Sequence, residues 1–330
     1  MINWEPLFAI LADKKKILIT SHARPDGDAL GTEFALCLAL RARGMEAVIV
    51  NTDVLPASFE FIGEDRYLLR IFGMDFPEED LEKIDLAMIV DTSAKKQLPR
   101  IYEALVQKNI PLVVIDHHAV GDTLTADMFC DENAPAAGAV LMDFLEFAKI
   151  PITEKMAEYL FMAIATDTGW FRFSSVLPKT FDQASRLMAC GADPAEIYAR
   201  VNESYPFSRT KLFGVLATNA TLEVDGRLAY SWITCDDFKK CDSDYSETTD
   251  MVNFLLTTAG TEVAITFMES ENGVRINFRS RSGVNVAEVA KLFGGGGHVR
   301  AAGAFLEKTL AEAIHTVLDE IRERMVKLNG

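Results

Sequence analysis

The first half of the chain alternates between short, continuous apolar runs and longer amphipathic stretches. Continuous apolar runs are typical of buried parallel strands, whereas the amphipathic stretches repeat their apolar residues with the period of a helix. The pattern predicts strands at 16–20, 46–51, 85–91 and 111–116, and helices at about 28–43, 97–108, 136–149 and 153–166. Strands and helices in alternation predict an α/β fold, a doubly wound parallel sheet with right-handed crossovers.

The pattern changes in the second half of the chain. Helical periodicity continues over 179–190 and 194–218, interrupted at Gly191. Beyond it, the pattern predicts a smaller α/β domain with a mixed sheet, its strands at 227–234, 262–269 and 273–280 and its helices near 247–259, 285–293 and 308–327. Asp225-Gly226 and the segment 270–273 are typical of hairpin turns. We therefore expect a first domain at 1–190, a helical linker at 191–220 and a second domain at 221–330.

Length and charge narrow the classes of function. A chain of 330 residues is long for one core and favours two domains. Its net charge of −16 argues against binding to long nucleic acid, whose affinity comes mainly from Lys and Arg neutralising phosphates. A short phosphorylated ligand is compatible with this charge, because bound divalent metals would reverse the local field.

Targeting features and cysteines indicate the compartment. No apolar stretch approaches the roughly 20 residues that cross a bilayer, so no membrane partner is expected. The N-terminus lacks the basic and apolar regions of a signal peptide. The five cysteines form no Cys-x-x-Cys pair. These features predict a cytoplasmic protein with reduced thiols.

Four clusters of Asp and His occupy comparable positions in the predicted first domain. Three follow predicted strands, whose carboxyl ends bind ligands in open α/β sheets, and the fourth ends a predicted helix. The clusters are His22/Asp26/Asp28, Asp91, Asp116-His117-His118 and Asp167. A single Asp after a strand is more often a helix N-cap, and a single buried His is more often a hydrogen-bonded core residue. Their coincidence in one domain favours a metal centre.

The donor types indicate which metal ions would bind. Imidazole and carboxylate ligands without thiolate suit Mn²⁺, Mg²⁺ or Fe²⁺ better than a structural zinc. The clusters offer too many donors for one ion, so we expect two ions about 3.5–4 Å apart, the usual arrangement for in-line attack on phosphorus. One carboxylate must then bridge the ions. Asp91 is the candidate, because it stands alone between the richer clusters.

A glycine-rich segment follows in the second half of the chain. Residues 294–303 contain four consecutive glycines, followed directly by His298. Without side chains, the backbone N–H groups of Gly295, Gly296 and Gly297 can approach an anion closely. A flexible loop is the more common meaning of such a run, so both interpretations stay open.

Arginines provide further candidates for contact with a phosphate. Arg279 and Arg281 alternate on a predicted strand, so they point to opposite faces and at most one reaches a given ligand. A guanidinium group matches the geometry of a phosphate. Arg172, which follows Asp167, is a weaker candidate for a substrate contact. Its alternative role is to cover the edge of an aromatic cluster.

Together these motifs resemble the DHH phosphoesterase superfamily. The resemblance rests on His22-x-x-x-Asp26-x-Asp28, Asp91-Thr-Ser, Asp116-His117-His118 and Thr166-Asp167-Thr168-Gly169. It implies that His22, Asp26 and Asp91 hold one Mn²⁺ ion. It implies that the other Mn²⁺ is held by Asp28, Asp91, His117 and Asp167. His118 would then face the substrate phosphate, while Asp116 supports the neighbouring imidazoles.

The glycine-rich segment resembles the DHH-associated C-terminal domain, and Arg279 falls where that domain carries a substrate-binding arginine. We expect no added oligonucleotide-binding domain, such as longer members of the superfamily carry, and the resemblance narrows to the short, stand-alone NrnA type. Such enzymes degrade short oligoribonucleotides to mononucleotides, and many also remove the 3′-phosphate from adenosine 3′,5′-bisphosphate. The resemblance also implies a homodimer, which no periodicity in the sequence supports.

We therefore expect hydrolysis by a hydroxide that bridges two metals and attacks phosphorus in line. His118 and Arg279 would neutralise the non-bridging oxygens, and His118 would protonate the leaving oxygen. His298 and the backbone of 295–297 would bind the distal phosphate or sugar. The alternatives are a phosphodiesterase for linear dinucleotides derived from cyclic ones, a short single-strand DNA exonuclease, a nucleotide-binding regulatory protein and a structural metalloprotein.

Overall fold

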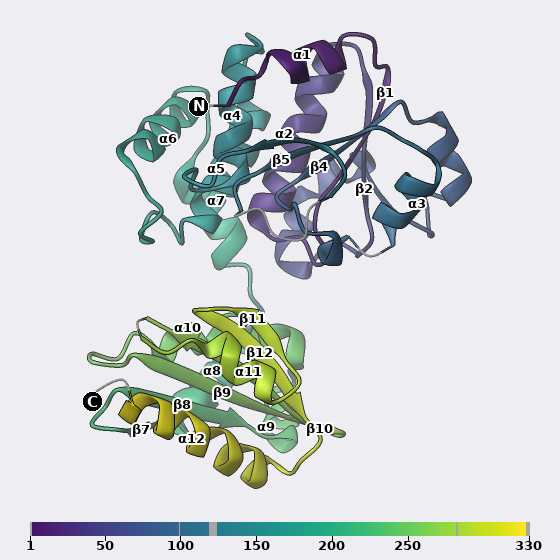
Figure 1. Ribbon diagram of the computed structural model, residues 1–330. Helices are drawn as coiled ribbons and strands as arrows, with labels where there is room; N and C mark the ends of the chain where they lie inside the picture. Colours follow the sequence, from purple (N-terminus) through teal and green to yellow (C-terminus); the bar gives the residue numbers. More distant parts are fainter. Residues whose placement is uncertain (1, 99, 119–123, 282, 328–330) are drawn as a thin grey trace. The chain divides into compact units, whose positions relative to one another are not determined.

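The protein is described here by a computed structural model, which covers residues 2–98, 100–118, 124–281 and 283–327. The chain forms two compact units, Met1–Ser204 and Tyr205–Gly330 (Figure 1). Each unit has its own hydrophobic core. The division falls inside the segment 191–220. Among the described residues, no helix is both long and apolar enough to span a membrane.

The first unit is built on a six-stranded parallel sheet. Its strands run in the order β3-β2-β1-β4-β5-β6. The strands are β1 (Lys16–Thr20), β2 (Glu46–Asn51), β3 (Leu69–Ile71), β4 (Leu86–Val90), β5 (Leu112–Asp116) and β6 (Asp127–Cys130). The chain leaves β1 towards one edge and β4 towards the other, so the strand order reverses between these two neighbours. Crevices at such a point are where open α/β sheets bind ligands.

Helices cover both faces of this sheet. Alternate residues of β1 enter different cores: Ile17 and Ile19 join one, and Leu18 joins the other. The first core contains α1 (Glu5–Leu11), α2 (Gly27–Ala42), α4 (Ala137–Phe147), α5 (Glu154–Asp167), α6 (Pro178–Ala189) and α7 (Pro194–Asn202). The second core contains α3 (Ile101–Gln107). The predicted doubly wound parallel sheet is confirmed.

Three glycines let α2, α4 and α5 approach one another closely. A Cβ atom added at Gly31 of α2 would lie 2.4 Å from the Tyr159 carbonyl oxygen of α5. A Cβ atom at Gly138 of α4 would lie 2.6 Å from the Ala163 Cβ of α5. Gly27 is equally close to the Thr166 side chain. Small residues at these contacts therefore fix the spacing of the helices.

The second unit is built on a mixed six-stranded sheet in the order β11-β12-β10-β9-β8-β7. All neighbouring strands are antiparallel except β8 and β9. The strands are β7 (Thr221–Glu223), β8 (Leu228–Ile233), β9 (Val263–Ser270), β10 (Gly273–Ser280), β11 (Gly296–His298) and β12 (Ala301–Leu306). The hairpins predicted at 225–226 and 270–273 are confirmed, as is the mixed sheet.

Helices lie on both faces of the second sheet. α11 (Val286–Leu292) and α12 (Leu310–Lys327) share one core with Ile276 and Phe278 of β10. The opposite face packs against α8 (Phe207–Thr218), α9 (Cys235–Cys241) and α10 (Met251–Leu255). Short 3-10 helices complete the fold: η1 (Ala57–Glu64), η2 (Arg66–Leu68), η3 (Glu78–Lys83), η4 (Lys95–Gln97) and η5 (Tyr245–Thr248).

Two predicted helices differ from the structure. The single helix expected at 194–218 is wrong: α7 ends at Asn202, and α8 begins at Phe207, directly after Pro206. Proline disfavours helical backbone in the residue before it, which explains the interruption. The helix expected near 247–259 is confined to Met251–Leu255, preceded by η5. The sequence pattern does not predict helix α1 or the strands β3, β6, β7, β11 and β12.

Candidate metal centre

The candidate site lies at the point where the strand order of the first sheet reverses. Loops that follow three adjacent strands bring in its side chains: His22 after β1, Asp91 after β4, and 116–118 at the end of β5. Asp26 and Asp28 stand at the start of α2, and Asp167 is the last residue of α5. The structure thus gathers the eight acidic and imidazole side chains of the first domain that were singled out in the sequence.

His22, Asp26 and Asp91 form the first group of donors. The Nε2 atom of His22 lies 3.4 Å from Asp91 Oδ2 and 3.9 Å from Asp26 Oδ1. His22 Nδ1 hydrogen-bonds the Ala23 carbonyl oxygen at 3.0 Å. Asp26 is the N-cap of α2 and accepts hydrogen bonds from the N–H groups of Asp28 and Ala29. These contacts orient both side chains towards Asp91.

His117 is at the centre of the second group. Its Nε2 atom lies 3.5 Å from Asp91 Oδ1, 3.5 Å from Asp167 Oδ2 and 3.7 Å from Asp28 Oδ2. Its Nδ1 atom lies 3.2 Å from the Ala134 carbonyl oxygen. When Nδ1 donates that hydrogen bond, the lone pair of Nε2 remains available for a metal ion.

Asp91 connects the two groups. One carboxyl oxygen faces His22 and the other faces His117. The residue is buried and has a φ of 58°, the left-handed region that Asp adopts more readily than most residues. Its backbone N–H is bonded to the Ile115 carbonyl oxygen of β5 at 3.0 Å, which fixes the turn.

The donor set fits divalent metal ions. Among the described residues, Asp91 Oδ1 and His117 Nε2 are buried without a hydrogen-bond partner, and both point into the cluster. Buried polar atoms normally have partners, and a metal ion would supply one here. Three groups of these side chains place donor atoms within 4.8 Å of one another. The arrangement can therefore hold metal ions through oxygen and nitrogen atoms alone.

Charge within the cluster shifts the pKa of its members in opposite directions. Burial lowers the pKa of His22 and His117, but Asp91 and the other carboxylates outweigh burial and raise those pKa values to about 9 and about 10. Burial raises the pKa of Asp91, but the two imidazoles outweigh it and hold that pKa at about 2. Burial, partly offset by His117, raises the pKa of Asp167 to about 6. The carboxylates are thus stabilised by positive charge, which protons or metal cations can provide.

Asp28 has a second set of contacts that the sequence did not reveal. Its carboxylate accepts hydrogen bonds from the N–H groups of Ala137 at 2.6 Å and Gly138 at 2.9 Å, and from the Thr32 hydroxyl at 3.1 Å. The two N–H groups belong to the first turn of α4, where backbone donors lack partners within the helix. Asp28 therefore ties α2 to α4 while its Oδ2 atom faces His117.

Asp116 and His118 stand beside the donors. Asp116 Oδ1 accepts hydrogen bonds from the backbone N–H groups of His117 and His118, and it lies 2.8 Å from His118 Nδ1. This bond to Asp116 raises the pKa of His118, although burial acts against it. The His118 side chain is 46% exposed, whereas Asp116 is fully buried. Asp116 therefore orients an imidazole that is partly exposed.

Arg172 follows an unusual turn after Asp167. Gly169, Trp170 and Phe171 all have left-handed backbone conformations, with φ values of 56°, 57° and 62°. Arg172 is exposed, and its Nε donates a hydrogen bond to the Gly169 carbonyl oxygen at 2.7 Å. Its guanidinium lies 6.0 Å from the centre of the Phe173 ring. Arg172 is thus held against its own turn, with other donors of the guanidinium still available.

The remaining predicted residues belong to the second unit. Arg279 on β10 is paired with Ala301 on β12, which is paired with His298 on β11. Directly paired antiparallel residues point to the same face, so Arg279 and His298 share one row across the sheet. Gly295 and Gly297 pack tightly against β12, whereas no heavy atom lies within 4 Å of a Cβ built at Gly296. The glycine-rich segment is therefore largely a hairpin of the sheet.

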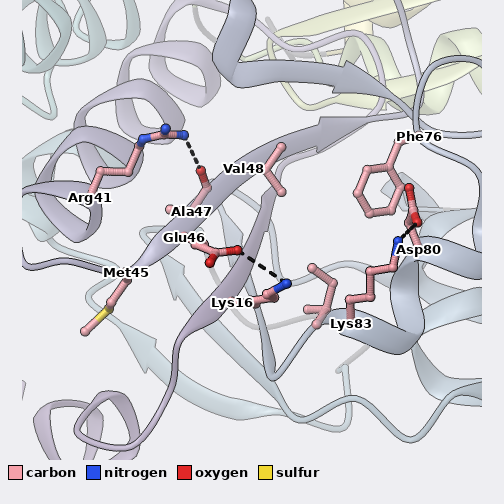
Figure 2. A pocket seen from close by; sticks show the side chains of 10 residues that line it. Lys16, Arg41, Met45, Glu46, Ala47, Val48, Phe76, Asp80 and Lys83 are labelled. Carbon is pink, nitrogen blue, oxygen red and sulfur yellow. Dashed lines mark hydrogen bonds and ion pairs between the residues drawn. The ribbon is translucent and has the colours of Figure 1, made fainter.

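A separate hollow of about 370 Å³ lies at the amino ends of β1 and β2. Figure 2 shows that its charged side chains have partners: Lys16 with Glu46, and Lys83 with Asp80. Arg41 donates a hydrogen bond to the Ala47 carbonyl oxygen at 3.0 Å. The acidic and imidazole cluster lies at the opposite, carboxyl ends of the strands. The hollow is therefore distinct from the candidate site.

Comparisons with known proteins agree with this arrangement. Residues 16–164 match the N-terminal domain of the DHH family, and residues 225–327 match the DHHA1 domain. The two matches together span most of the chain. The chain belongs to the DHH phosphoesterases and is a hydrolase of that class, with a DHHA1 domain following its DHH domain.

Individual relatives narrow the comparison further. The bifunctional oligoribonuclease and PAP phosphatase NrnA of Thermus thermophilus is 28% identical over 313 residues, which are 94% of this chain and 90% of that protein. An exopolyphosphatase-related protein from Bacteroides fragilis has the same fold, with a TM-score of 0.91 at 22% identity over 99% of this chain and 97% of that one. RecJ of Thermus thermophilus in complex with Mn²⁺ matches with a TM-score of 0.55 at 14% identity, over 97% of this chain and 54% of that one.

Proposed function

We propose that this chain is a Mn²⁺-dependent phosphoesterase that hydrolyses short oligoribonucleotides to mononucleotides and removes the 3′-phosphate of adenosine 3′,5′-bisphosphate. The observation that carries the proposal is the position of Asp91, which offers one carboxyl oxygen to each of two donor groups. The named activities of the Thermus thermophilus relative, which this chain matches over nearly its full length, supply the substrates.

In this proposal Asp91 is shared by two metal sites. One site is formed with His22 and Asp26, and the other with Asp28, His117 and Asp167. Two bound Mn²⁺ ions would stabilise negative charge on the phosphate and lower the pKa of the attacking water. Mg²⁺ and Fe²⁺ accept the same oxygen and nitrogen donors.

The neighbouring residues act on the substrate. His118, oriented by Asp116, contacts a non-bridging oxygen and protonates the leaving oxygen, a role that its partly exposed side chain allows. Arg279 binds a phosphate through its guanidinium, and His298 with the backbone of 295–297 binds the distal phosphate or sugar. Arg172 is a further candidate for a phosphate contact.

Incubation of the pure protein with Mn²⁺ and either a labelled dinucleotide or adenosine 3′,5′-bisphosphate tests the proposal. Wild type is expected to release mononucleotide and inorganic phosphate. Asp91→Asn removes the shared oxygen charge, so activity should fall more than about a hundredfold, beyond the usual cost of losing a residue that only orients a ligand. Asp13→Asn, an exposed carboxylate of the same unit, is the matched control.

Melting temperature gives an independent readout of metal binding. A cation that binds only the folded protein raises its stability by about 2.7 kcal/mol at a concentration of 100 times its dissociation constant. Mn²⁺ should raise the melting temperature of wild type and Asp13→Asn, and should leave Asp91→Asn unchanged. Hydrolysis of both substrates by Asp91→Asn at the wild-type rate contradicts the proposed function.

A further inference from the structure

One face of the second sheet is covered over only part of its width. On β8 and β9, residues Ala229, Ile233, Ala264 and Met268 are buried against α8, α9 and α10. On β10, β12 and β11 the residues of this face are partly or fully exposed. We call these residues the open sheet face: Arg275, Asn277 and Arg279 of β10, Ala301, Gly303 and Phe305 of β12, and Gly296 and His298 of β11.

The open sheet face consists of three rows set by strand pairing. The first row carries Arg279 and His298, which the proposed function already assigns to the substrate. Same-face residues on one strand follow each other at about 7 Å, so the third row begins about 13 Å from the first along β10. An oligonucleotide that starts at Arg279 and runs along β10 therefore meets the second and third rows in turn.

The second row is a floor of bare backbone. Asn277 on β10 is paired with Gly303, which is paired with Gly296 on β11. A Cβ atom at Gly303 would find its nearest neighbours at 3.4 Å and 3.9 Å, the latter being Asn277 Oδ1, and one at Gly296 would find none within 4 Å. The Asn277 amide is the polar side chain beside this floor. A flat base or a sugar can lie here against backbone, within reach of one amide.

The third row combines a cation with two aromatic rings. Arg275 is exposed, and its guanidinium lies 4.4 Å from the centre of the Tyr245 ring. Phe305 is paired directly with Arg275 and is 42% exposed. An arginine packed over an aromatic ring can still donate N–H groups to a phosphate, while a neighbouring ring can stack on a base. This combination is typical of sites that bind single-stranded nucleic acid without reading its sequence.

Charge favours a nucleotide as the occupant of this face. In a chain with a net charge of −16, the open sheet face carries Arg275, Arg279 and His298 and no carboxylate of its own. Among the ion pairs of the described residues, the one at this face joins Arg279 to Asp250, which lies 3.5 Å away and belongs to the segment before α10. Asp250 faces the first row, so the charge of Arg275 in the third row is available to a second phosphate.

We propose that the open sheet face binds the substrate nucleotides beyond the first, and that Arg275 and Phe305 determine the preference for an oligonucleotide over a nucleoside bisphosphate. This inference rests on the proposed function, because it assumes that Arg279 holds the first nucleotide. Arg275 contacts the phosphate of a later nucleotide, and Phe305 stacks on its base. A nucleoside bisphosphate is too short to reach the third row.

Binding to the full-length protein in the presence of a metal chelator tests this without any hydrolysis. The probe is a fluorescent oligoadenylate of five nucleotides, measured by anisotropy, with adenosine 3′,5′-bisphosphate as an unlabelled competitor. Arg275→Gln and Phe305→Leu should each raise the ratio of the oligonucleotide dissociation constant to that of the bisphosphate about tenfold. Phe305→Leu keeps an apolar side chain on β12 and removes only the flat ring.

Salt dependence supplies a second readout for the phosphate contact. Each phosphate neutralised on a single strand contributes about 0.7 to the slope of log affinity against log salt concentration. Arg275→Gln should therefore reduce that slope by about 0.7. Arg324→Gln removes the same charge from α12, on the opposite side of the sheet, and should change neither the slope nor the ratio.

Two outcomes overturn the inference. One is a ratio that stays within twofold of wild type in both Arg275→Gln and Phe305→Leu. The other is an unchanged ratio with an altered sedimentation coefficient, which assigns the face to a second copy of the chain. Neither outcome depends on turnover, so a failure of the proposed hydrolysis remains distinguishable from a failure of this inference.

Discussion

Glu33 of α2 is a carboxylate that lies close to the candidate metal centre but is not one of the expected metal ligands. It is fully buried and accepts a hydrogen bond from the Asn51 amide at 2.9 Å, while its other oxygen has no partner among the described residues. Burial raises the pKa of Glu33 to about 7, against the opposing effects of Asn51, Ser21 and His22. Its ionisation therefore costs free energy in the folded protein.

Glu33 makes the stability of the metal-free protein depend on pH. Its pKa is about 7 when folded and about 4.5 when unfolded, so the folded state binds more protons between these values. The stabilising contribution is complete below pH 4.5 and is lost as pH rises through 7, which amounts to about 3.4 kcal/mol in total at 1.36 kcal/mol per pKa unit, of which about 2 to 3 kcal/mol falls between pH 5 and pH 8. Urea unfolding of wild type and Glu33→Gln at pH 5 and pH 8, with chelator, measures this term.

Glu33→Gln keeps the shape of the side chain and its acceptor for Asn51 but cannot ionise. The variant should gain stability relative to wild type by about 2 to 3 kcal/mol between the two pH values, since all other groups titrate alike in both proteins. Equal changes in the two proteins would show that Glu33 ionises at its ordinary pKa. Asn51→Asp would add a second carboxylate and should steepen the pH dependence.

The positions of the candidate donors could be predicted because the sequence marks them locally. His22, Asp91 and His117 each follow a strand that is predicted by a continuous apolar run in the sequence. Adjacent parallel strands then bring their carboxyl ends together. The contacts of Asp28 with α4 could not be predicted. They join residues more than 100 positions apart through backbone N–H groups, which leave no trace in the side-chain pattern.

At the scale of elements, the glycine-rich hairpin shows that two of the consecutive glycines are needed where the backbone approaches β12 closely. Gly297 has a φ of 140°, and a Cβ atom there would lie 2.5 Å from the Ala301 carbonyl oxygen. Gly295 has a negative φ, but its Cβ atom would lie 2.1 Å from the Gly303 carbonyl oxygen. These two glycines let β11 pair closely with β12 in the sheet, while Gly296 between them faces open space.

Substitution should separate these roles. Gly297→Ala forces a strained backbone and a clash, which costs about 1 to 3 kcal/mol and should open the β11–β12 hairpin locally. Hydrogen exchange of the peptide covering 294–306, read by mass spectrometry, should become faster, with no change in α2 or α5. Gly296→Ala is the control and should exchange like wild type. Equal protection in both variants would contradict the close approach of β11 and β12.

Sequence pattern predicted some strands and missed others for a physical reason. β1, β4 and β5 are buried on both faces and contain runs of apolar residues, so their pattern is strong. β3 and β6 are edge strands of three and four residues that include Arg70 and Asp127, and their pairing depends on strands already in place. β11 and β12 are rich in glycine and alanine, residues that are depleted in strands.

At the scale of the whole molecule, the two units are joined by a short exposed segment. Residues 203–206 between α7 and α8 are exposed, and Pro206 prevents a continuous helix. Each unit buries its own core, so neither needs the other to hide apolar surface. The segment is therefore the expected place for cleavage without unfolding.

Limited digestion with a glutamate-specific protease should cut first after Glu203. Two fragments, 1–203 and 204–330, are expected by mass spectrometry, and each should keep cooperative thermal unfolding after separation. Neither fragment alone should hydrolyse the dinucleotide, because the candidate metal centre and Arg279 lie on different fragments. Glu203→Gln should remove this first cut. Early cleavage inside α2 or β10 instead would show that the units are not independently folded.

The close packing of α2, α4 and α5 also bears on which cation the centre prefers. A Cβ atom at Gly31 or at Gly138 would meet the same Ala163 methyl group, at 2.9 Å and 2.6 Å. Ala163 lies one turn before Asp167 on α5. Gly31 lies one turn after Asp28 on α2, and Gly138 of α4 donates a backbone hydrogen bond to Asp28. A larger residue at 163 would push apart α2 and α5, which carry the two carboxylates, and so widen the spacing of the donor atoms. Selectivity between small and large divalent cations depends on cavity size as well as on donors. We therefore expect the packing at Ala163 to influence which ionic radius the proposed site accepts, although Ala163 supplies no donor atom.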